Sequence, residues 1–315
     1  MVGMKKLCFC LIPILLLCSC SRAAQITEVN GFYFDTYVNI TLYEDNVSVK
    51  TELPKLLSSL ELIYSPTLPE SELYRLNHAL IRKPESEELR KTLEEAMYYE
   101  VLSGGALNAS IGSVSALWDF HTDSPAVPDS ASVNAALKQI KKGADYLSDR
   151  ELSLDLGCIA KGAISFRVRD YLLDQGVSSA IIDLGGNVVV IGGKPDGRPF
   201  TVGIQDPLAK DKVLRTVQVK DCCVVTSGTY ERCFEADGKL YHHILDPQTG
   251  YPAESGLSSV TILCADPVMA DALSTACMVL GKEEGLALIE TIDDCEALFI
   301  DGDMNMYPSS GFPPQ

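Results

Sequence analysis

The order of helix and strand patterns in the second half of the chain limits the fold more than any other feature. Alternating and apolar runs predict a strand at 152–156, a helix at 159–175 and a strand at 180–184. Strand patterns then flank turn sequences such as Pro195-Asp196-Gly197 and Asp237-Gly238, which favour hairpins. One strand–helix–strand unit followed by antiparallel hairpins predicts an α+β fold: a single large domain of mixed and antiparallel sheets with packed helices.

Periodic segments elsewhere complete this expected fold. Glycines that can end helices follow the segments at 87–103, 132–142 and 268–280, at Gly104, Gly143 and Gly281. The other predicted elements are a helix at 47–63 and strands at 31–43, 188–191, 200–204, 232–235, 241–245, 260–264, 297–300 and 305–307. The strands at 188–191 and 200–204 are expected to form one hairpin, and those at 232–235 and 241–245 another.

The first residues are typical of an export signal. Lys5 and Lys6 precede an apolar run at 7–17, which is shorter than the roughly 20 residues that a transmembrane helix needs. The end of this run, Leu17-Cys18-Ser19-Cys20, resembles the bacterial lipobox, in which cleavage exposes a cysteine that receives lipid. The alternative is an ordinary signal with incidental cysteines.

This interpretation divides the chain into three parts. We expect a lipoprotein signal peptide at 1–19, a linker near the anchor at 20–30 and the folded domain at 31–315. Lipid on Cys20 would hold the protein at a cell membrane, facing the periplasm or the cell exterior.

The charge of the chain restricts its partners. Asp and Glu number 43 and Lys and Arg 26, so that the net charge is -17. This excess repels the phosphate backbone of nucleic acids, which we exclude as partners. It favours divalent cations, and an anionic substrate would need a metal ion or a helix N-terminus to bind.

The cysteines beyond the signal show no C-x-x-C spacing, so a structural zinc site is not expected. Several lie in apolar runs, where cysteine behaves as a small buried hydrophobe, and the sequence does not reveal any pairing. They are Cys158, Cys222, Cys223, Cys233, Cys264, Cys277 and Cys295.

Two segments have the residue types of a metal site and an anion site. Asp271 and Thr275 lie four residues apart in a predicted helix, so both oxygens project from one face, as Mg²⁺ ligands can. The segment from Asp155 to Gly162 turns at Gly157 into a helix whose first N–H groups, with Lys161, could hold a phosphate. Each pattern alone is more often structural, as a dipole and packing choice or as an ordinary strand–helix junction.

Other segments place glycine or polar residues at strand ends. Gly185-Gly186-Asn187 and Thr226-Ser227-Gly228 could let a ligand approach the backbone closely. The strand at 241–245 contains His242 and His243, which face opposite ways, so at most one points into a given site. Either could instead be a hydrogen-bonded core or surface imidazole.

In this order, these segments resemble the FAD:protein FMN transferase family, the ApbE-type lipoproteins. The resemblance runs nearly end to end, and its most specific motifs are Asp155 to Gly162 (family D-L-G-G-I-A-K-G) and Ala270 to Ala276 (family A-D-A-L-S-T-A). The other matching motifs are Phe34-Asp35-Thr36, Ser71-Glu72-Leu73 with Leu76-Asn77, 103–120, 185–187, 226–228 and 243–250.

The resemblance implies a metal ion, Mg²⁺, held by Asp271, Thr275 and a backbone carbonyl near Cys158. The implied reaction is attack by a Ser or Thr hydroxyl of an acceptor protein on the FMN phosphorus of FAD, which releases AMP. His243 and then Asp246 are the candidate bases for the hydroxyl proton. The residues that the resemblance places around FAD are Thr36, Ala106, Leu107, Asn108, Asp155, Lys161, Gly185, Gly186, Ser227, Gly228, His243, Ile244 and Leu245. Acceptors in the family carry an S/T-G-A-T/S motif, typically in subunits of membrane redox complexes.

One motif departs from the family. Where the family reads G-A-F-D-P-T, this chain reads Gly105 to Ser110 as G-A-L-N-A-S, which lacks an aromatic ring and a carboxylate. The amide of Asn108 can still form hydrogen bonds. Two alternative functions stay open: an Mg²⁺-dependent FAD pyrophosphatase that uses water and yields FMN and AMP, and a flavin-binding or solute-binding lipoprotein without catalysis.

Overall fold

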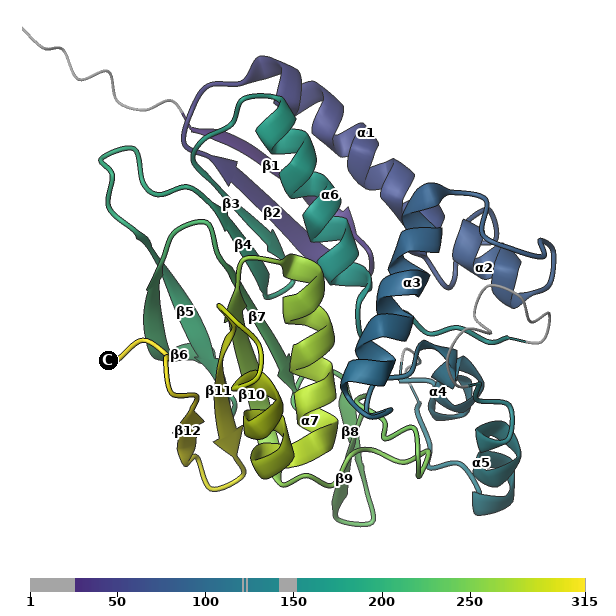
Figure 1. Cartoon of the computed structure of the whole chain (residues 1–315). Helices are drawn as coiled ribbons and strands as arrows, with labels where there is room; N and C mark the ends of the chain where they lie inside the picture. Colours follow the sequence, from purple (N-terminus) through teal and green to yellow (C-terminus); the bar gives the residue numbers. More distant parts are fainter. Residues whose placement is uncertain (1–25, 121, 123, 142–151, 315) are drawn as a thin grey trace, which may run out of the picture.

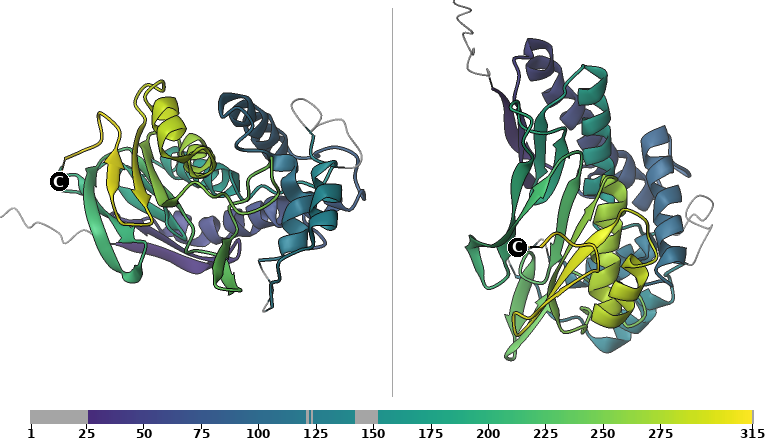
Figure 2. Two further views of the ribbon diagram at one scale, coloured as in Figure 1. Left: turned by 90° about the horizontal axis from the view of Figure 1, so that it is seen from below. Right: turned by 60° about the vertical axis from the view of Figure 1, so that its left-hand side comes forward.

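A central antiparallel sheet organises the computed structural model, which describes residues 26–120, 122, 124–141 and 152–314. Eight strands lie in the order β1-β2-β3-β4-β7-β10-β11-β12, and all neighbours are antiparallel (Figure 1). Helices cover one face of the sheet, and the hairpin β5–β6 lies on the other (Figure 2). The α+β fold predicted from the sequence is confirmed, with its sheets antiparallel throughout the described residues.

The elements have the following bounds. The strands of the large sheet are β1 (Thr27–Tyr33), β2 (Thr36–Leu42), β3 (Ala180–Leu184), β4 (Asn187–Ile191), β7 (Cys223–Gly228), β10 (Leu257–Cys264), β11 (Glu296–Asp301) and β12 (Met306–Pro308). The two small hairpins are β5 (Phe200–Asp206) with β6 (Ala209–Val219), and β8 (Cys233–Ala236) with β9 (Lys239–His242). The helices are α1 (Val47–Tyr64), α2 (Glu72–Asn77), α3 (Glu87–Leu102), the 3₁₀ turn η1 (Ala109–Ile111), α4 (Gly112–Trp118), α5 (Ser130–Leu137), α6 (Ala160–Asp174) and α7 (Pro267–Ile289).

The main core lies between the helices and the sheet. Leu53, Leu57 and Leu60 follow helical spacing along α1 and are buried in this core. On the opposite face, alternate residues of β5 from Phe200 to Ile204 are buried against β4, β7, β10 and β11. The sheet is therefore covered by helices on one face and, from β4 to β11, by β5–β6 on the other, whereas that second face stays exposed on β1 and β2, at Phe32 and Tyr37.

Helix α7 begins within one residue of its predicted start but continues beyond its predicted end. The Asp266 carboxylate accepts hydrogen bonds from the Val268 and Met269 N–H groups, which satisfies the first turn. Gly281 leaves helical geometry at φ 80°, where the sequence predicts the helix end, but the chain then resumes the helix to Ile289. Gly281, which was predicted to end the helix, therefore produces a kink within it.

Two of the predicted strands are wrong. The single strand expected at 31–43 is the hairpin β1–β2, because Phe34 and Asp35 take positive φ and turn the chain. The segment 152–156 is extended but joins no sheet, because the Asn77 side chain takes both the N–H and the carbonyl of Leu154. Strand β1 also begins at Thr27, within the stretch expected to be a linker.

The hairpin expected between 188–191 and 200–204 is also wrong. Strand β4 instead pairs with β3 across Gly185-Gly186, and β5 pairs with β6. Both glycines have positive φ, which a two-residue hairpin turn requires. The hairpin expected around Asp237-Gly238 is confirmed as β8–β9.

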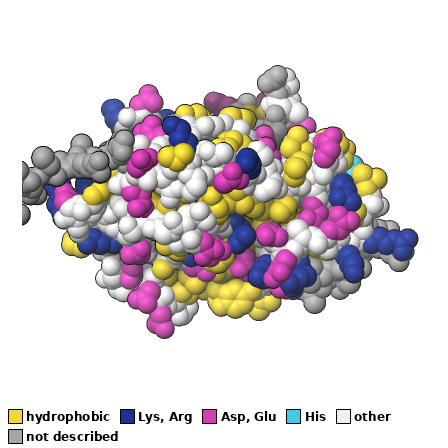
Figure 3. All heavy atoms as spheres, turned by 90° about the horizontal axis from the view of Figure 1, so that it is seen from above, with side chains coloured by type: hydrophobic (Ala, Val, Ile, Leu, Met, Phe, Trp, Pro, Cys, Tyr) yellow, Lys and Arg dark blue, Asp and Glu magenta, His cyan; other side chains and the backbone are white. Residues whose placement is uncertain are grey.

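Some predictions fall outside the described residues: the signal, the lipid acceptor Cys20, and the helix end at Lys142 and Gly143. Within the described part of the chain, no helix combines the length and apolarity needed to cross a membrane. The face in Figure 3 shows acidic and basic side chains interspersed among apolar ones.

Candidate active site

The start of α6 and the first turns of α7 pack against each other at a glycine. A Cβ on Gly162 would lie 2.5 Å from the Pro267 carbonyl oxygen and 2.8 Å from the Asp271 Cβ, so only glycine permits this approach. The approach lets the Gly162 N–H donate to the buried Asp271 Oδ2 at 2.8 Å. A backbone donor from α6 thereby fixes the carboxylate of α7.

The carbonyl of Cys158 lies just before α6. The helix begins at Ala160 with Ile159 as its N-cap, and its first intrahelical bond runs from the Ala163 N–H to the Ile159 carbonyl. The Gly162 N–H therefore has no acceptor within the helix. Among the described residues, no backbone N–H donates to the Cys158 carbonyl, whose oxygen is therefore available to a ligand.

Hydroxyl groups from β7 and α7 complete the cluster. Thr275 lies one turn after Asp271, and its Oγ1 is 3.3 Å from Ser227 Oγ of β7. Ser227 Oγ also lies 2.8 Å from Ser274 Oγ, which donates to the Asp271 carbonyl. The group therefore offers carboxylate, hydroxyl and carbonyl oxygens, a donor set that suits a hard divalent cation. The described residues contain no group of three or more His, Cys, Asp or Glu side chains arranged for a metal ion.

An amide links this cluster to the predicted lysine. The Asn187 Nδ2 donates to Asp271 Oδ1 at 2.8 Å, and Lys161 Nζ donates to Asn187 Oδ1 at 2.9 Å. Asn187 was not among the predicted site residues, although it follows the Gly185-Gly186 motif that was. Its burial and its two charged partners make it the positioning residue of this site.

The turn before Asn187 brings in another predicted residue. A Cβ on Gly185 would lie 2.0 Å from Thr36 Oγ1, so Thr36 of β2 lies directly against this turn. The Asp183 carboxylate accepts from the Gly186 N–H at 2.8 Å, and burial raises its pKa. Thr36, Gly185 and Gly186 therefore meet at one end of the sheet.

The two histidines have different environments. His242 is buried, and its Nε2 lies 3.2 Å from the Ala253 carbonyl oxygen, a structural role. The Nδ1 atoms of both His242 and His243 are buried without a hydrogen-bond partner among the described residues. Burial, followed by the nearby charges of Arg232 and Lys161, lowers the pKa of His243 to about 4. His243 is therefore neutral at pH 7 and able to accept a proton.

Asp246, the other candidate base, stabilises the turn that follows it in the chain. Its Oδ1 accepts from the Gln248 N–H at 2.8 Å, and its carbonyl accepts from Gly250. The Trp118 Nε1–H donates to the Gly250 carbonyl and anchors this turn to α4. This geometry favours His243 as the base.

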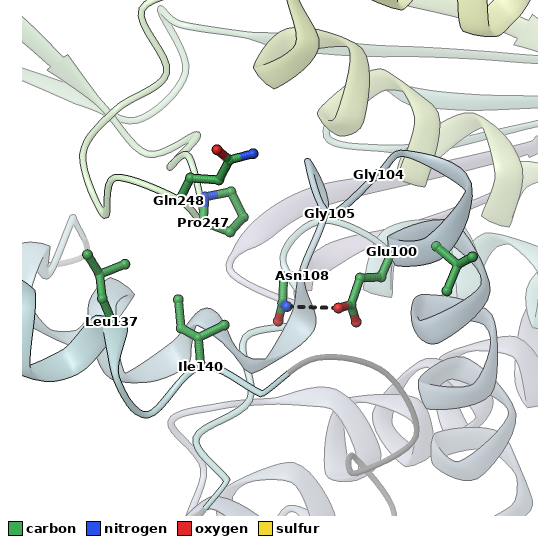
Figure 4. Close-up of a pocket in the computed structure, with 9 residues that line it drawn as sticks. Glu100, Gly104, Gly105, Asn108, Leu137, Ile140, Pro247 and Gln248 are labelled. Carbon is green, nitrogen blue, oxygen red and sulfur yellow. Dashed lines mark hydrogen bonds between the residues drawn. The ribbon is translucent and has the colours of Figure 1, made fainter.

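A cavity of about 820 Å³ opens beside this turn (Figure 4). Of the site residues predicted from the sequence, Asn108 lines this cavity. The lining residues are Glu100, Val101, Gly104, Gly105, Asn108, Leu137, Ile140, Pro247 and Gln248. Apolar side chains of Leu137, Ile140 and Pro247 lie opposite the polar pair Glu100 and Asn108 (Figure 4). Apolar walls with a few polar groups are typical of small-molecule and cofactor sites.

The amide of Asn108 is committed to the protein. Its Nδ2 donates to Glu100 Oε1 at 3.2 Å and to the Lys141 carbonyl at 2.9 Å. Its Oδ1 accepts from the N–H and the hydroxyl of Ser110. An amide has two donor and two acceptor positions, and all four are used here. Glu100, which sequence reasoning missed, supplies the carboxylate in this wall.

Several predicted FAD-lining residues have buried side chains. Leu107, Ile244 and Leu245 are packed in apolar clusters, and Ala106 is also buried. Any contact that Leu107, Ile244 or Leu245 makes with a ligand would therefore be through the backbone. Asp155, which accepts from the Gly157 N–H, and Lys161 are more accessible and keep polar side-chain atoms near the start of α6.

The chain is similar to known proteins over almost its whole length. Residues 34–299 match the ApbE family. The chain is 35% identical to the FAD:protein FMN transferase of Treponema pallidum, over 93% of this chain and 90% of that protein. It is 34% identical to a FAD:protein FMN transferase of Klebsiella pneumoniae, over 86% of this chain and 88% of that protein.

Solved structures show the same fold. The flavin transferase ApbE from Vibrio cholerae superposes with a TM-score of 0.81 at 30% identity, covering 92% of this chain and 98% of that one. The ApbE protein from Thermotoga maritima gives a TM-score of 0.82 at 29% identity, covering 91% and 98%.

Proposed function

The chain belongs to the ApbE family, and we propose that it transfers the FMN half of FAD to a Ser or Thr hydroxyl of an acceptor protein, using Mg²⁺. It is a transferase of the FAD:protein FMN class, like its named relatives. The acceptor would carry an S/T-G-A-T/S motif in a membrane redox-complex subunit, and lipid on Cys20 would hold the enzyme at the same membrane.

One observation carries the metal part of the proposal. The Gly162 N–H, which has no acceptor within α6, holds the Asp271 carboxylate, and the Cys158 carbonyl just before the helix accepts no backbone hydrogen bond among the described residues. Asp271, Thr275 and that carbonyl would hold Mg²⁺, while Asn187 and Gly162 fix the carboxylate orientation. When bound, Mg²⁺ would neutralise charge on the pyrophosphate and on the AMP leaving group.

The remaining residues would bind and orient FAD and accept a proton. The acceptor oxygen forms a bond to the FMN phosphorus, the anhydride bond to the AMP phosphate breaks, and AMP leaves with the electron pair. His243, neutral at pH 7, would take the hydroxyl proton at Nδ1. Lys161 adds a positive charge beside the reacting phosphates.

The test is transfer in a defined mixture. The protein is incubated with FAD, Mg²⁺ and a domain bearing the acceptor motif, and acceptor mass and released AMP are measured. We expect the acceptor to gain the mass of FMN. The rate of this gain should fall by at least about 100-fold in Asp271→Ala. Glu284→Ala changes an exposed carboxylate on the same helix and should keep the wild-type rate.

The same mixture separates the alternatives. AMP and free FMN without acceptor mass gain would identify a pyrophosphatase. FAD that stays bound and intact would leave only a binding role. Unchanged turnover in Asp271→Ala would contradict the metal site.

A further inference from the structure

Three cysteines lie at one end of neighbouring strands of the sheet: Cys223 in β7, Cys264 in β10, and Cys295 directly before β11. Cys264 is the last residue of β10 and pairs with Cys223 of β7. On its other side, Leu263 pairs with Glu296 of β11, so the next position along sets Cys264 opposite Cys295. Directly opposed residues of antiparallel strands have Cα atoms about 4.5–5.5 Å apart, within the range that a disulfide spans.

The side chains of Cys264 and Cys295 also share one face. Both are buried, 5% and 3% exposed, in the apolar cluster on the helix side of the sheet. Their thiols are in hydrogen-bond contact, and this contact, together with burial, raises the pKa of Cys264. The Cys264 thiol also lies 3.1 Å from the Asp266 carbonyl oxygen, and the Cys223 thiol donates to the Ala265 carbonyl at 3.6 Å, but the thiol–thiol hydrogen bond joins Cys264 to Cys295. Cys295 is therefore the better partner for Cys264.

We propose that Cys264 and Cys295 form an intrachain disulfide when the protein folds in an oxidising compartment. Two thiols lose two protons and two electrons to a disulfide oxidant such as oxidised glutathione, which becomes two glutathione thiols. Such bonds persist outside reducing compartments, a condition that the predicted export would provide. This inference does not depend on the proposed transferase activity.

The bond would close the segment that contains α7. Cys264 lies just before Pro267, where α7 begins, and Cys295 lies shortly after it ends at Ile289. This helix carries Asp271 and Thr275, so the bond would tie both ends of the segment that presents these ligands. A cross-link that closes a loop of roughly 30 residues stabilises the folded protein, because it reduces the conformational freedom of the unfolded chain.

The raised pKa also affects when the bond forms. The thiolate is the attacking species in thiol–disulfide exchange, and a buried thiol with a raised pKa supplies little of it. The folded, reduced protein should therefore react slowly with oxidised glutathione. A chain that is refolding should react readily, and the folded product should resist reduction.

The experiment refolds the reduced full chain with oxidised glutathione, blocks free thiols, and maps the peptides by mass spectrometry. We expect one linked peptide pair joining Cys264 to Cys295 and a mass about 2 Da lower for that pair than in the reduced sample. The oxidised protein should unfold at a temperature higher by about 5 °C or more than the reduced protein.

Variants provide the controls. Cys223→Ser leaves the pair intact and should keep both the linkage and the higher unfolding temperature. Cys295→Ser should lose both, and if it fails to fold, the peptide map of the wild-type chain still decides. A Cys223–Cys264 linkage, or free thiols at both Cys264 and Cys295 in correctly refolded protein, would overturn the proposal.

Discussion

At the scale of single residues, Asn108 stands where the family motif has aspartate, and this difference allows a carboxylate to lie next to it. Its amide donates to Glu100, a buried carboxylate in the same cavity wall. An aspartate at 108, as in the family motif, could not make this donation. The carboxylate that the motif lacks at 108 is instead present at 100.

We predict that Asn108→Asp, which restores the family residue, is destabilising. It removes the donors to Glu100 and Lys141 and places two buried carboxylates within about 3 Å of each other. The expected loss is about 2–4 kcal/mol in the free energy of unfolding at pH 7, measured by urea denaturation.

The matched control for this prediction is the double variant Asn108→Asp with Glu100→Gln. The new glutamine can donate to the new aspartate, so much of the stability should return. If Asn108→Asp alone is as stable as wild type, the Glu100 contact is not what requires the amide.

His243 gives a prediction about pH. Its pKa is about 4 in the folded protein and 6.5 ordinarily, mainly because of burial. Between these values the unfolded chain binds more protons, so the His243 contribution is complete above pH 6.5 and is lost as the pH falls towards 4. Wild type should lose about 1–2 kcal/mol more than His243→Gln between pH 7 and pH 5, measured by urea unfolding. Equal losses in the two proteins would show that folding does not lower the pKa of His243.

At the scale of elements, the contact between α6 and α7 depends on the absence of a side chain at Gly162. We predict that Gly162→Ala separates the two helices, because its Cβ would lie 2.5 Å from the Pro267 carbonyl oxygen. The expected cost is about 1–3 kcal/mol in unfolding free energy, together with weaker Mg²⁺ binding by calorimetry.

Gly302→Ala is the control for helix separation. Its added Cβ would meet nothing closer than the Gly256 carbonyl oxygen at 3.9 Å. Stability should change by no more than about 0.5 kcal/mol, and Mg²⁺ affinity should stay the same. Equal behaviour of the two alanine variants would show that the helices adapt to the extra methyl group.

At the scale of the whole molecule, the proposed lipid anchor on Cys20 would decide where the enzyme acts. We predict that the wild-type chain is found in the membrane fraction and that Cys20→Ser moves it to the soluble fraction. The reason is that acyl chains contribute about 0.8 kcal/mol per buried CH₂ group to membrane binding. Cell fractionation with immunoblotting makes the measurement.

Cys18→Ser is the matched control for the anchor. It changes a cysteine two residues away while leaving Cys20 in place. This variant should stay in the membrane fraction. Release of both variants, or of neither, would contradict lipid attachment at Cys20.

Local patterns in the sequence were sufficient for many elements. The helical period placed α1, α3 and α6 within a few residues, and Asp237-Gly238 placed the β8–β9 hairpin. Asp271 and Thr275 share a helix face because of their spacing alone. These features depend on interactions within a few residues, which a sequence displays directly.

The tertiary structure decided the features that depend on distant partners. Asn77 takes the backbone groups of Leu154, so an extended segment that reads as a strand joins no sheet. Gly162 and Asn187 acquire their roles only through hydrogen bonds to Asp271, which lies about a hundred positions away in the chain. Spacing along the chain fixes which side chains share a helix face. Which backbone groups find partners is decided only when distant elements pack, because each N–H can satisfy only some of the acceptors brought near it.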